Sequence, residues 1–330
     1  MNVYVNRSYF AETLGLERIT RGLAPFTRWV EQLDPDLATC CRSLLGSEVA
    51  YSNLVNLPFL VAEPFGLGLD HEWITELVAG NAFMLTYFLA SDQLVDCPAR
   101  AHRFLVLLAT RLHVEMWKHY DRVAPGRAAH IWGDLVADHV RGVLAEEAHH
   151  AACRAGRSPL DLLAYQRLVV EKNRYGMAAI PLLAAATGNR EPEERLRQMY
   201  DCIAVEIEFD DDLKDWREDV TEGRFTPVVS ALAAAAPHRA DPDVLAAALV
   251  TSPAIASMLD LVQARLDEAL QTLSNVRFSC VLLRQWIERH RAANQHLKAE
   301  YVARQVRSIL ARSVAAPPPG STSREVPHAG

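Results

Sequence analysis

Apolar positions recur at intervals of three and four residues through most of this chain, which is the spacing of one face of an α-helix. The clearest run extends over 72–96, where Leu77, Met84 and Phe88 share such a face. It ends before Cys97-Pro98, because a proline pushes the residue before it out of the helical region. No alternating stretch of strand length occurs, and no hairpin dipeptide lies between apolar runs. The pattern therefore predicts an all-α protein.

The same spacing places further helices, and capping residues set their limits. Ser158, followed by Pro159 and Asp161, is a typical helix start, and Pro181 should kink or end the helix that begins there. We expect roughly ten to twelve helices in one domain over 1–314 and a disordered proline-rich tail over 315–330. The helices expected after residue 96 cover 100–120, 131–153, 158–187, 191 to about 223, 227–236, 243–250, 252–273 and one or two within 276–315.

One of these helices carries many acids. Residues 208–219 read EFDDDLKDWRED, amid apolar neighbours such as Ile203 and Trp216. At 3.6 residues per turn one stripe contains Asp201, Glu208, Asp212, Asp215 and Asp219, with Asp211 at its edge. Like charges three and four residues apart repel, so a purely structural helix would avoid this arrangement. Carboxylate oxygens are ligands for hard cations such as Mg²⁺, and the stripe therefore predicts a divalent metal site.

A second acidic pair ends the apolar helix over 72–96. Asp92 and Asp96 lie four residues apart and share a helix face. Acids at a helix C-terminus oppose the helix dipole, so cations are expected beside them. Together the two clusters indicate two carboxylate walls that face each other across a cavity, with metal ions between them.

Composition narrows the classes of protein. The chain has 330 residues and a net charge of -7, which argues against nucleic acid as the main partner because phosphate binding needs clustered cations. The six cysteines form no CxxC pair, there is no secretory signal, and no charge-free apolar run reaches the length of a membrane span. We therefore expect a cytoplasmic protein with reduced thiols and no integral membrane segment.

The acidic motifs resemble those of trans-isoprenyl diphosphate synthases over roughly residues 70 to 230. Asp211, Asp212 and Asp215 take the positions of the second DDxxD motif, and Asp92 and Asp96 take the outer acids of the first. Further matches are EGRFTP at 222–227, with Arg224 where the family has lysine, and Lys172-Asn173, similar to a Lys-Thr pair that contacts diphosphate. The resemblance implies the all-α isoprenoid synthase fold, a helical bundle around a central apolar cavity, with three Mg²⁺ ions that hold an allylic prenyl diphosphate.

The resemblance also implies roles for other residues. Glu208 would join the metal ligands, and Arg100 and Lys298 would join Lys172 and Arg224 at the diphosphate. Aromatic side chains would line the cavity and stabilise a carbocation by cation–π attraction, although each also fits simple core packing. These are Phe83, Tyr87, Phe88, Tyr175 and Phe209. A homodimer is expected on the same ground.

Departures from the family pattern favour a different reaction. Gln93 replaces an acid of the first motif, and no GGKxxRP element for a second diphosphate precedes residue 92. An enzyme with one diphosphate site should ionise one substrate and steer the carbocation, as a class I terpene synthase, a lyase, does.

Three alternatives stay open at this point. The chain is also compatible with a prenyl diphosphate synthase. The DWRED run at 215–219 followed by Gly223-Arg224 resembles squalene and phytoene synthases, which join two prenyl diphosphates head to head. The degenerate DQLVD at 92–96 would also suit a non-catalytic partner subunit of the same fold.

Adjacent histidines at His149 and His150 follow Glu146 and Glu147. Neighbours in sequence point to different faces of a helix, so they are expected on a solvated surface and not at a metal.

Overall fold

A computed structural model describes residues 2–44, 49–96, 103–156, 161–235, 242–274 and 276–315. Within these ranges the chain forms α-helices and three short 3₁₀ helices, with no strand. The α-helices are α1 (Asn2–Thr13), α2 (Leu16–Glu31), α3 (Pro35–Leu44), α4 (Asn53–Ala62), α5 (Glu72–Asp96), α6 (Leu105–Val123), α7 (Ala128–Arg154), α8 (Leu162–Asn173), α9 (Ala179–Thr187), α10 (Glu191–Glu222), α11 (Pro227–Ala235), α12 (Pro242–Thr251), α13 (Pro253–Thr272) and α14 (Val281–Ala315). The 3₁₀ helices are η1 (Val49–Tyr51), η2 (Glu63–Phe65) and η3 (Arg174–Met177). The all-α prediction is confirmed.

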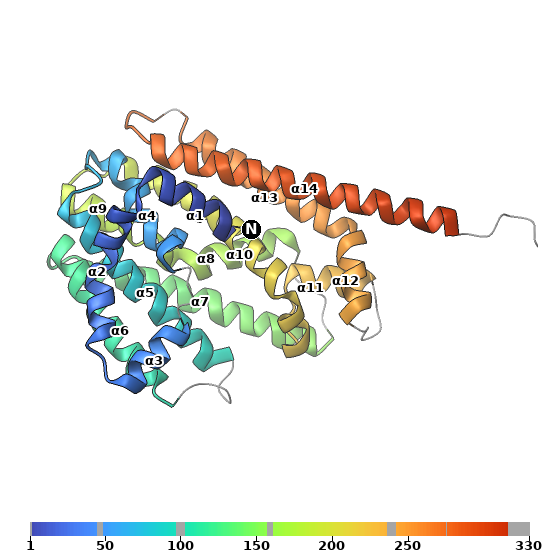
Figure 1. Cartoon of the computed structure of the whole chain (residues 1–330), viewed down its shortest axis with the longest axis horizontal. Helices are drawn as coiled ribbons and strands as arrows, with labels where there is room; N and C mark the ends of the chain where they lie inside the picture. Colours follow the sequence, from blue (N-terminus) through green and yellow to red (C-terminus); the bar gives the residue numbers. More distant parts are fainter. Residues whose placement is uncertain are drawn as a thin grey trace, which may run out of the picture.

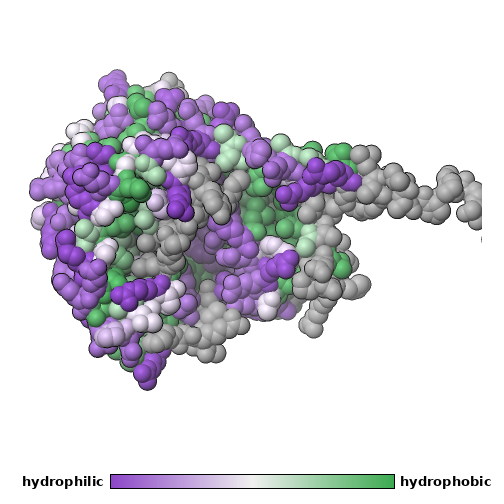
Figure 2. Space-filling view, viewed as in Figure 1, coloured by the Kyte–Doolittle hydropathy of each residue, from purple (hydrophilic) through white to green (hydrophobic). Residues whose placement is uncertain are grey.

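The helices form a bundle in which α5 and α10 are central (Figure 1). α5 packs against α2, α4 and α6, while α10 packs against α8 and α13. α13 and α14 run side by side along one edge, and α14 continues beyond the body of the molecule (Figure 1 and Figure 2). Buried apolar side chains form one cluster that extends from α1 to α14.

α5 is the most apolar long helix of the bundle. Over 72–95 it is long and apolar enough to cross a membrane by length and composition, yet 67% of the 18-residue segment that meets this test is buried inside the bundle. Ile74, Leu77 and Met84 are fully buried. A core helix passes the same test of length and hydropathy as a membrane span, and the burial identifies α5 as a core helix.

Glycines allow two helix pairs to approach closely. A Cβ added at Gly142 of α7 would lie 2.4 Å from the backbone nitrogen of Lys172 in α8. At Gly80 of α5 it would lie 2.6 Å from the ring of Tyr120 in α6. A separation near 2.5 Å is far inside van der Waals contact, so only glycine fits at either position. The first contact sets the position of Lys172 relative to α7.

The expected helix over 158–187 is wrong, because the structure divides it. α8 begins after Asp161, whose carboxylate accepts a hydrogen bond of 2.7 Å from the Ala164 N–H and forms the N-cap. The break falls at η3, not at Pro181, which lies in the first turn of α9 where a missing N–H costs little. Ser158 and Pro159, and the tail over 316–330, lie outside the described residues.

The sequence pattern assigned no element before Glu72, where the structure has α1 to α4. α3 and α4 each span ten residues, which is too short for a clear 3.6-residue period. α2 is longer, and Pro25 lies inside it. These helices form part of the wall that packs on α5.

Gly142→Ala should lower the free energy of unfolding by about 1–3 kcal/mol, because the added methyl forces α7 and α8 apart. Gly133→Ala on the same helix is the matched control, since nothing lies within 4 Å of the added Cβ there. That control should gain about 0.5–1 kcal/mol from helix propensity. Urea unfolding of both variants measures the difference, and equal values would show that the close approach carries no cost.

Candidate functional site

A cavity of about 370 Å³ opens between α5, α7, α8 and the C-terminal half of α10. Its volume lies in the range of about 300–1,000 Å³ typical of small-molecule sites. One part of the lining is polar and the other apolar. The side chains around it are Tyr87, Phe88, Ser91, Asp92, Val95, Val136, His139, Val140, Val143, Leu144, Glu146, Glu147, His150, Lys172, Glu208, Asp211, Asp212, Asp215, Glu218, Asp219, Arg224 and Thr226.

α10 supplies the acidic wall. The helix starts with Pro192 in its first turn and acids that complement its dipole, and it ends at Gly223 with φ +70°. Only glycine adopts this left-handed conformation readily. Its six acids at the cavity are Glu208, Asp211, Asp212, Asp215, Glu218 and Asp219.

The opposite wall comes from the end of α5. Asp92 lines the same cavity as Asp211, Asp212 and Asp215, although the two sets of residues lie far apart in the sequence. The structure therefore brings together the acids that the sequence predicted on facing walls. The side chain of Asp96 and the whole of Arg100 lie outside the described residues.

Lys172 connects three helices at the base of the acidic wall. Its Nζ lies 2.9 Å from Oε2 of Glu146 and 2.8 Å from Oε1 of Glu208. The side-chain amide of Asn173 donates a hydrogen bond of 2.9 Å to the other oxygen of Glu208. Burial alone would raise the pKa of Glu208, but Lys172 and Asn173 outweigh it and hold that pKa below its ordinary value. Both carboxylate oxygens of Glu208 are thus engaged by protein groups.

The other acids of α10 repel one another. Burial, Glu208 and Asp215 raise the pKa of Asp211 to about 6. Burial and Glu208 also raise the pKa of Asp212 well above its ordinary value, although Tyr165 donates a hydrogen bond to its carboxylate. For both carboxyl groups, nearby cations do not outweigh burial and the repulsion of neighbouring acids, so the charged form is disfavoured.

The donor set fits a hard divalent cation. Nine carboxylates and two cations, Lys172 and Arg224, line the cavity among the residues that the structure describes. Over the same residues, no three His, Cys, Asp or Glu side chains lie close enough to coordinate one ion. Mg²⁺ typically binds one or two carboxylates and completes its shell with water and substrate phosphate, so a protein cage of three ligands is not required.

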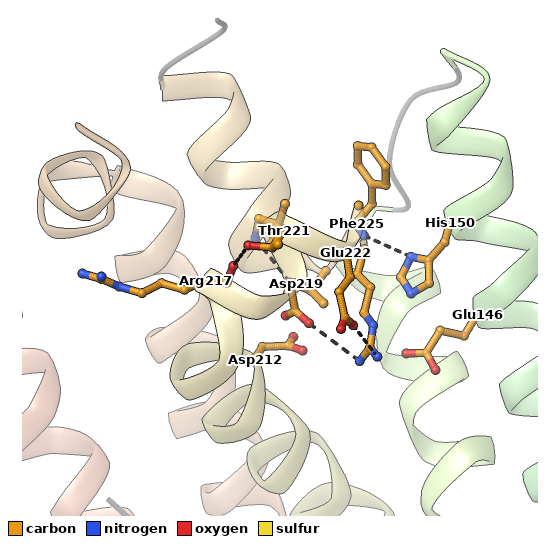
Figure 3. A network of polar contacts seen from close by, with 12 residues as sticks. Glu146, His150, Asp212, Arg217, Asp219, Thr221, Glu222 and Phe225 are labelled. Atoms are coloured by element: carbon orange, nitrogen blue, oxygen red, sulfur yellow. Dashed lines mark hydrogen bonds and ion pairs between the residues drawn. The ribbon is translucent and has the colours of Figure 1, made fainter. Parts of the chain in front are cut away.

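Arg224 enters the cavity from the loop after α10. Its guanidinium lies 2.8 Å from Glu222 and 3.9 Å from Asp219, which are marked by dashed lines in Figure 3. Its backbone N–H donates a hydrogen bond of 2.8 Å to the carbonyl of Asp219 and closes the helix end. Thr226, which also lines the cavity, accepts a hydrogen bond from the Val229 N–H and caps α11.

The expectation that His149 and His150 lie on a solvated surface is wrong. His150 is 4% exposed and lines the cavity. Its Nδ1 accepts a hydrogen bond of 3.0 Å from the Phe225 N–H, and Nε2 of His149 donates one of 3.1 Å to the Phe225 carbonyl. The two rings lie side by side, with centroids 5.5 Å apart, and both bind the backbone of Phe225 in the loop after α10. No local pattern in the sequence indicates that approach.

The apolar part of the cavity is formed mainly by α7, which the sequence did not single out. Val136, Val140, Val143 and Leu144 lie along one side of that helix. Tyr87 and Phe88 of α5 face them, so two of the five predicted aromatic residues line the cavity. An apolar lining of this kind suits a hydrocarbon chain attached to a polar head.

The remaining predicted residues lie elsewhere. Phe83 is part of the core beside Phe26 and Trp29, and Tyr175 packs behind Phe88 with ring centroids 3.7 Å apart. Three other predicted residues do not line the cavity: Phe209 is buried, Lys298 of α14 pairs with Asp260 of α13, and Asp201 pairs with Arg174.

Asp219 makes stability depend on pH. Burial first, and then Asp215 and Asp211, raise its pKa from 3.8 to about 6 despite the opposing charge of Arg224. A carboxyl whose pKa is raised in the folded chain stabilises the fold below the unfolded pKa, and that contribution is lost as pH rises through the folded value. The wild-type protein therefore loses stability between about pH 4 and pH 6 through this group.

Asp219→Asn should raise the free energy of unfolding by about 1–2 kcal/mol at pH 7.5, since one pKa unit corresponds to about 1.4 kcal/mol and the Arg224 contact is lost. The gain should vanish near pH 4, where both chains carry a neutral side chain. Urea unfolding at the two pH values, with chelator present, provides the measurement. A gain that is equal at both pH values would contradict the electrostatic cause.

Comparison with known proteins agrees with this geometry. No protein-family model and no curated protein matches the chain. A solved structure of a geranylgeranyl pyrophosphate synthetase from the archaeon Geoglobus acetivorans matches with a TM-score of 0.67 at 16% identity, over 83% of this chain and 98% of that one. At such low identity the match establishes the fold. The chain therefore has the all-α fold of the trans-isoprenyl diphosphate synthases, as its aspartate motifs predicted.

Proposed function

We propose that this protein is a Mg²⁺-dependent prenyltransferase that binds an allylic prenyl diphosphate in the cavity and transfers its prenyl group to a second substrate. The observation that supports it is the single cavity in which Asp92 faces Asp211, Asp212 and Asp215. The likeness in fold to a geranylgeranyl pyrophosphate synthetase favours transfer over the cyclisation expected from the sequence.

The polar end of the cavity suits a diphosphate. Asp92, Asp211, Asp212 and Asp215 would hold Mg²⁺, which acts as a Lewis acid toward the phosphate oxygens when bound. Arg224 adds a planar donor that matches phosphate geometry, and Lys172 adds a second positive charge. These groups stabilise the negative charge that develops as the diphosphate leaves.

The apolar end suits the prenyl chain. Val136, Val140 and Val143 of α7 offer no hydrogen bond, and a prenyl chain bound against them would exclude water from a reactive cation. The ring of Phe88 lies between this surface and Tyr175 behind it, and its face can stabilise the cation by up to about 2 kcal/mol when desolvated.

Cyclisation of one prenyl diphosphate, the reaction of a terpene synthase, is the second candidate. Lys172 and Arg224 are the cations that line the cavity in the described part of the chain, and both already contact carboxylates. Two cations suit the binding of one diphosphate better than the binding of two diphosphates. Glu218 and Asp219 also line the cavity, which keeps head-to-head condensation within this proposal. The cytoplasmic location, the homodimer and the number of Mg²⁺ ions stay predictions.

The test is incubation of the full chain with geranyl, farnesyl and geranylgeranyl diphosphates and Mg²⁺, with and without isopentenyl diphosphate, followed by mass spectrometry. A longer diphosphate that forms with isopentenyl diphosphate supports transfer. A hydrocarbon from one diphosphate alone supports the cyclase, and a C30 or C40 product from two allylic diphosphates supports head-to-head joining. No turnover under any condition would favour the non-catalytic subunit.

Asp215→Ala should reduce turnover at least about a hundredfold while the helical fold persists, because a carboxylate that faces the metal is lost. Asp201→Ala is the matched control on the same helix. Asp201 pairs with Arg174, with 3.6 Å between the charged groups, and does not line the cavity. Steady-state rates and circular dichroism of both variants make the comparison. Unchanged turnover in Asp215→Ala would remove this residue from the site.

A further inference from the structure

The loop that carries Arg224 is held by the C-terminal end of α7. Phe225, the next residue, has both of its backbone polar groups bound: His150 accepts its N–H at 3.0 Å and His149 donates to its carbonyl at 3.1 Å. On the other side of Arg224, Arg154 donates a hydrogen bond of 3.3 Å to the carbonyl of Gly223. His149, His150 and Arg154, in the last two turns of α7, thus fix the backbone on both sides of Arg224.

Figure 3 shows the contact of His150 with Phe225 beside the acids of α10. Because the Phe225 N–H points at Nδ1, that nitrogen must carry a lone pair and the ring must be neutral. Burial and neighbouring cations lower the pKa of His150 to about 4, which keeps the ring neutral at physiological pH. His149 has the opposite polarity, since its Nε2–H donates to a carbonyl.

The loop has few other constraints. Gly223 adopts a left-handed conformation that other residues avoid, and it ends α10. The Arg224 N–H is bound within the helix end, at the Asp219 carbonyl. After Arg224 the chain is fixed by the two hydrogen bonds of Phe225 to α7 and by Thr226, which caps α11. A guanidinium on a flexible side chain reaches a defined point only if its backbone is fixed.

We propose that His149 and His150 are positioning residues that fix Arg224 at the diphosphate end of the cavity. The inference rests on the proposed function, because it assigns Arg224 to an anionic ligand. His150 does not act as a metal ligand through Nδ1, since the Phe225 N–H occupies that atom. His149 and His150 thus connect α7, which lines the apolar part of the cavity, to Arg224 at the diphosphate end.

The test uses substitutions that remove or preserve one hydrogen bond each. His150→Ala removes the acceptor, whereas His150→Asn places Oδ1 near the position of Nδ1. His149→Ala removes the donor, whereas His149→Gln places an N–H near the position of Nε2. His296→Ala is the control, because His296 is exposed and pairs with Glu300 on α14. The ligand is inorganic pyrophosphate with Mg²⁺, measured by calorimetry on the full chain.

The alanine variants should bind pyrophosphate about tenfold more weakly than the wild type, while the Asn and Gln variants should recover most of the affinity. Adding His150→Ala to Arg224→Ala should cause no further loss, because His150 acts through Arg224. Without any ligand, hydrogen exchange at the Phe225 amide should be faster in His150→Ala than in His150→Asn. A purely structural role would not produce this pattern.

The outcomes separate the two proposals. A wild-type chain that does not bind pyrophosphate with Mg²⁺ contradicts the proposed function. If the wild type binds and His150→Ala binds equally well, the positioning role is wrong while the function stands. An equal loss in the wild-type and Arg224→Ala backgrounds likewise overturns it, since the histidine would then act independently of Arg224. Should His150→Ala not fold, His149→Ala and the exchange measurement on His150→Asn decide the question.

Discussion

The ion pairs of Lys172 with Glu146 and Glu208 are the interaction on which the site depends. They join α7, α8 and α10 around one positive charge that is largely enclosed by protein. Removing ions from water is costly, and the cost is recovered only when geometry and hydrogen bonds are favourable. Asn173 supplies the additional hydrogen bond to Glu208, and the close approach at Gly142 brings the backbone of α8 to the required position. The remaining acids of α10 then face a cavity whose frame is already fixed.

α10 therefore has two distinct surfaces along one length. Its cavity side carries carboxylates with raised pKa values. On the other side Asp210 pairs with Lys214, and Leu213 lines a second cavity of about 260 Å³ with residues of α12, α13 and α14. Phe209 and Trp216 are buried between these surfaces. The helix tolerates a concentration of like charge because its apolar residues anchor it in the core while the acids line the cavity.

Local signals in the sequence were sufficient to predict the helical class and the acidic walls. Asp92, Asp211, Asp212 and Asp215 could be found because their spacing follows the helix period and their charge conflicts with the surrounding apolar residues. Tertiary contacts were not accessible in this way. His150 binds Phe225, which lies 75 residues later in the chain, and Gly176 of η3 leaves the space that the Tyr200 hydroxyl occupies. Lys298 was expected at the diphosphate because it is basic, but in the structure it pairs with Asp260.

Asp92 and Asp219 lie near the C-terminal ends of α5 and α10, where the partial negative charge of the backbone adds to that of the side chains. A free diphosphate that approaches the cavity thus meets a negative potential, whereas a diphosphate already bound to a divalent cation meets much less repulsion. Under the proposed function, this arrangement favours entry of cation and substrate as one complex, and the same field would assist the departure of an uncomplexed diphosphate.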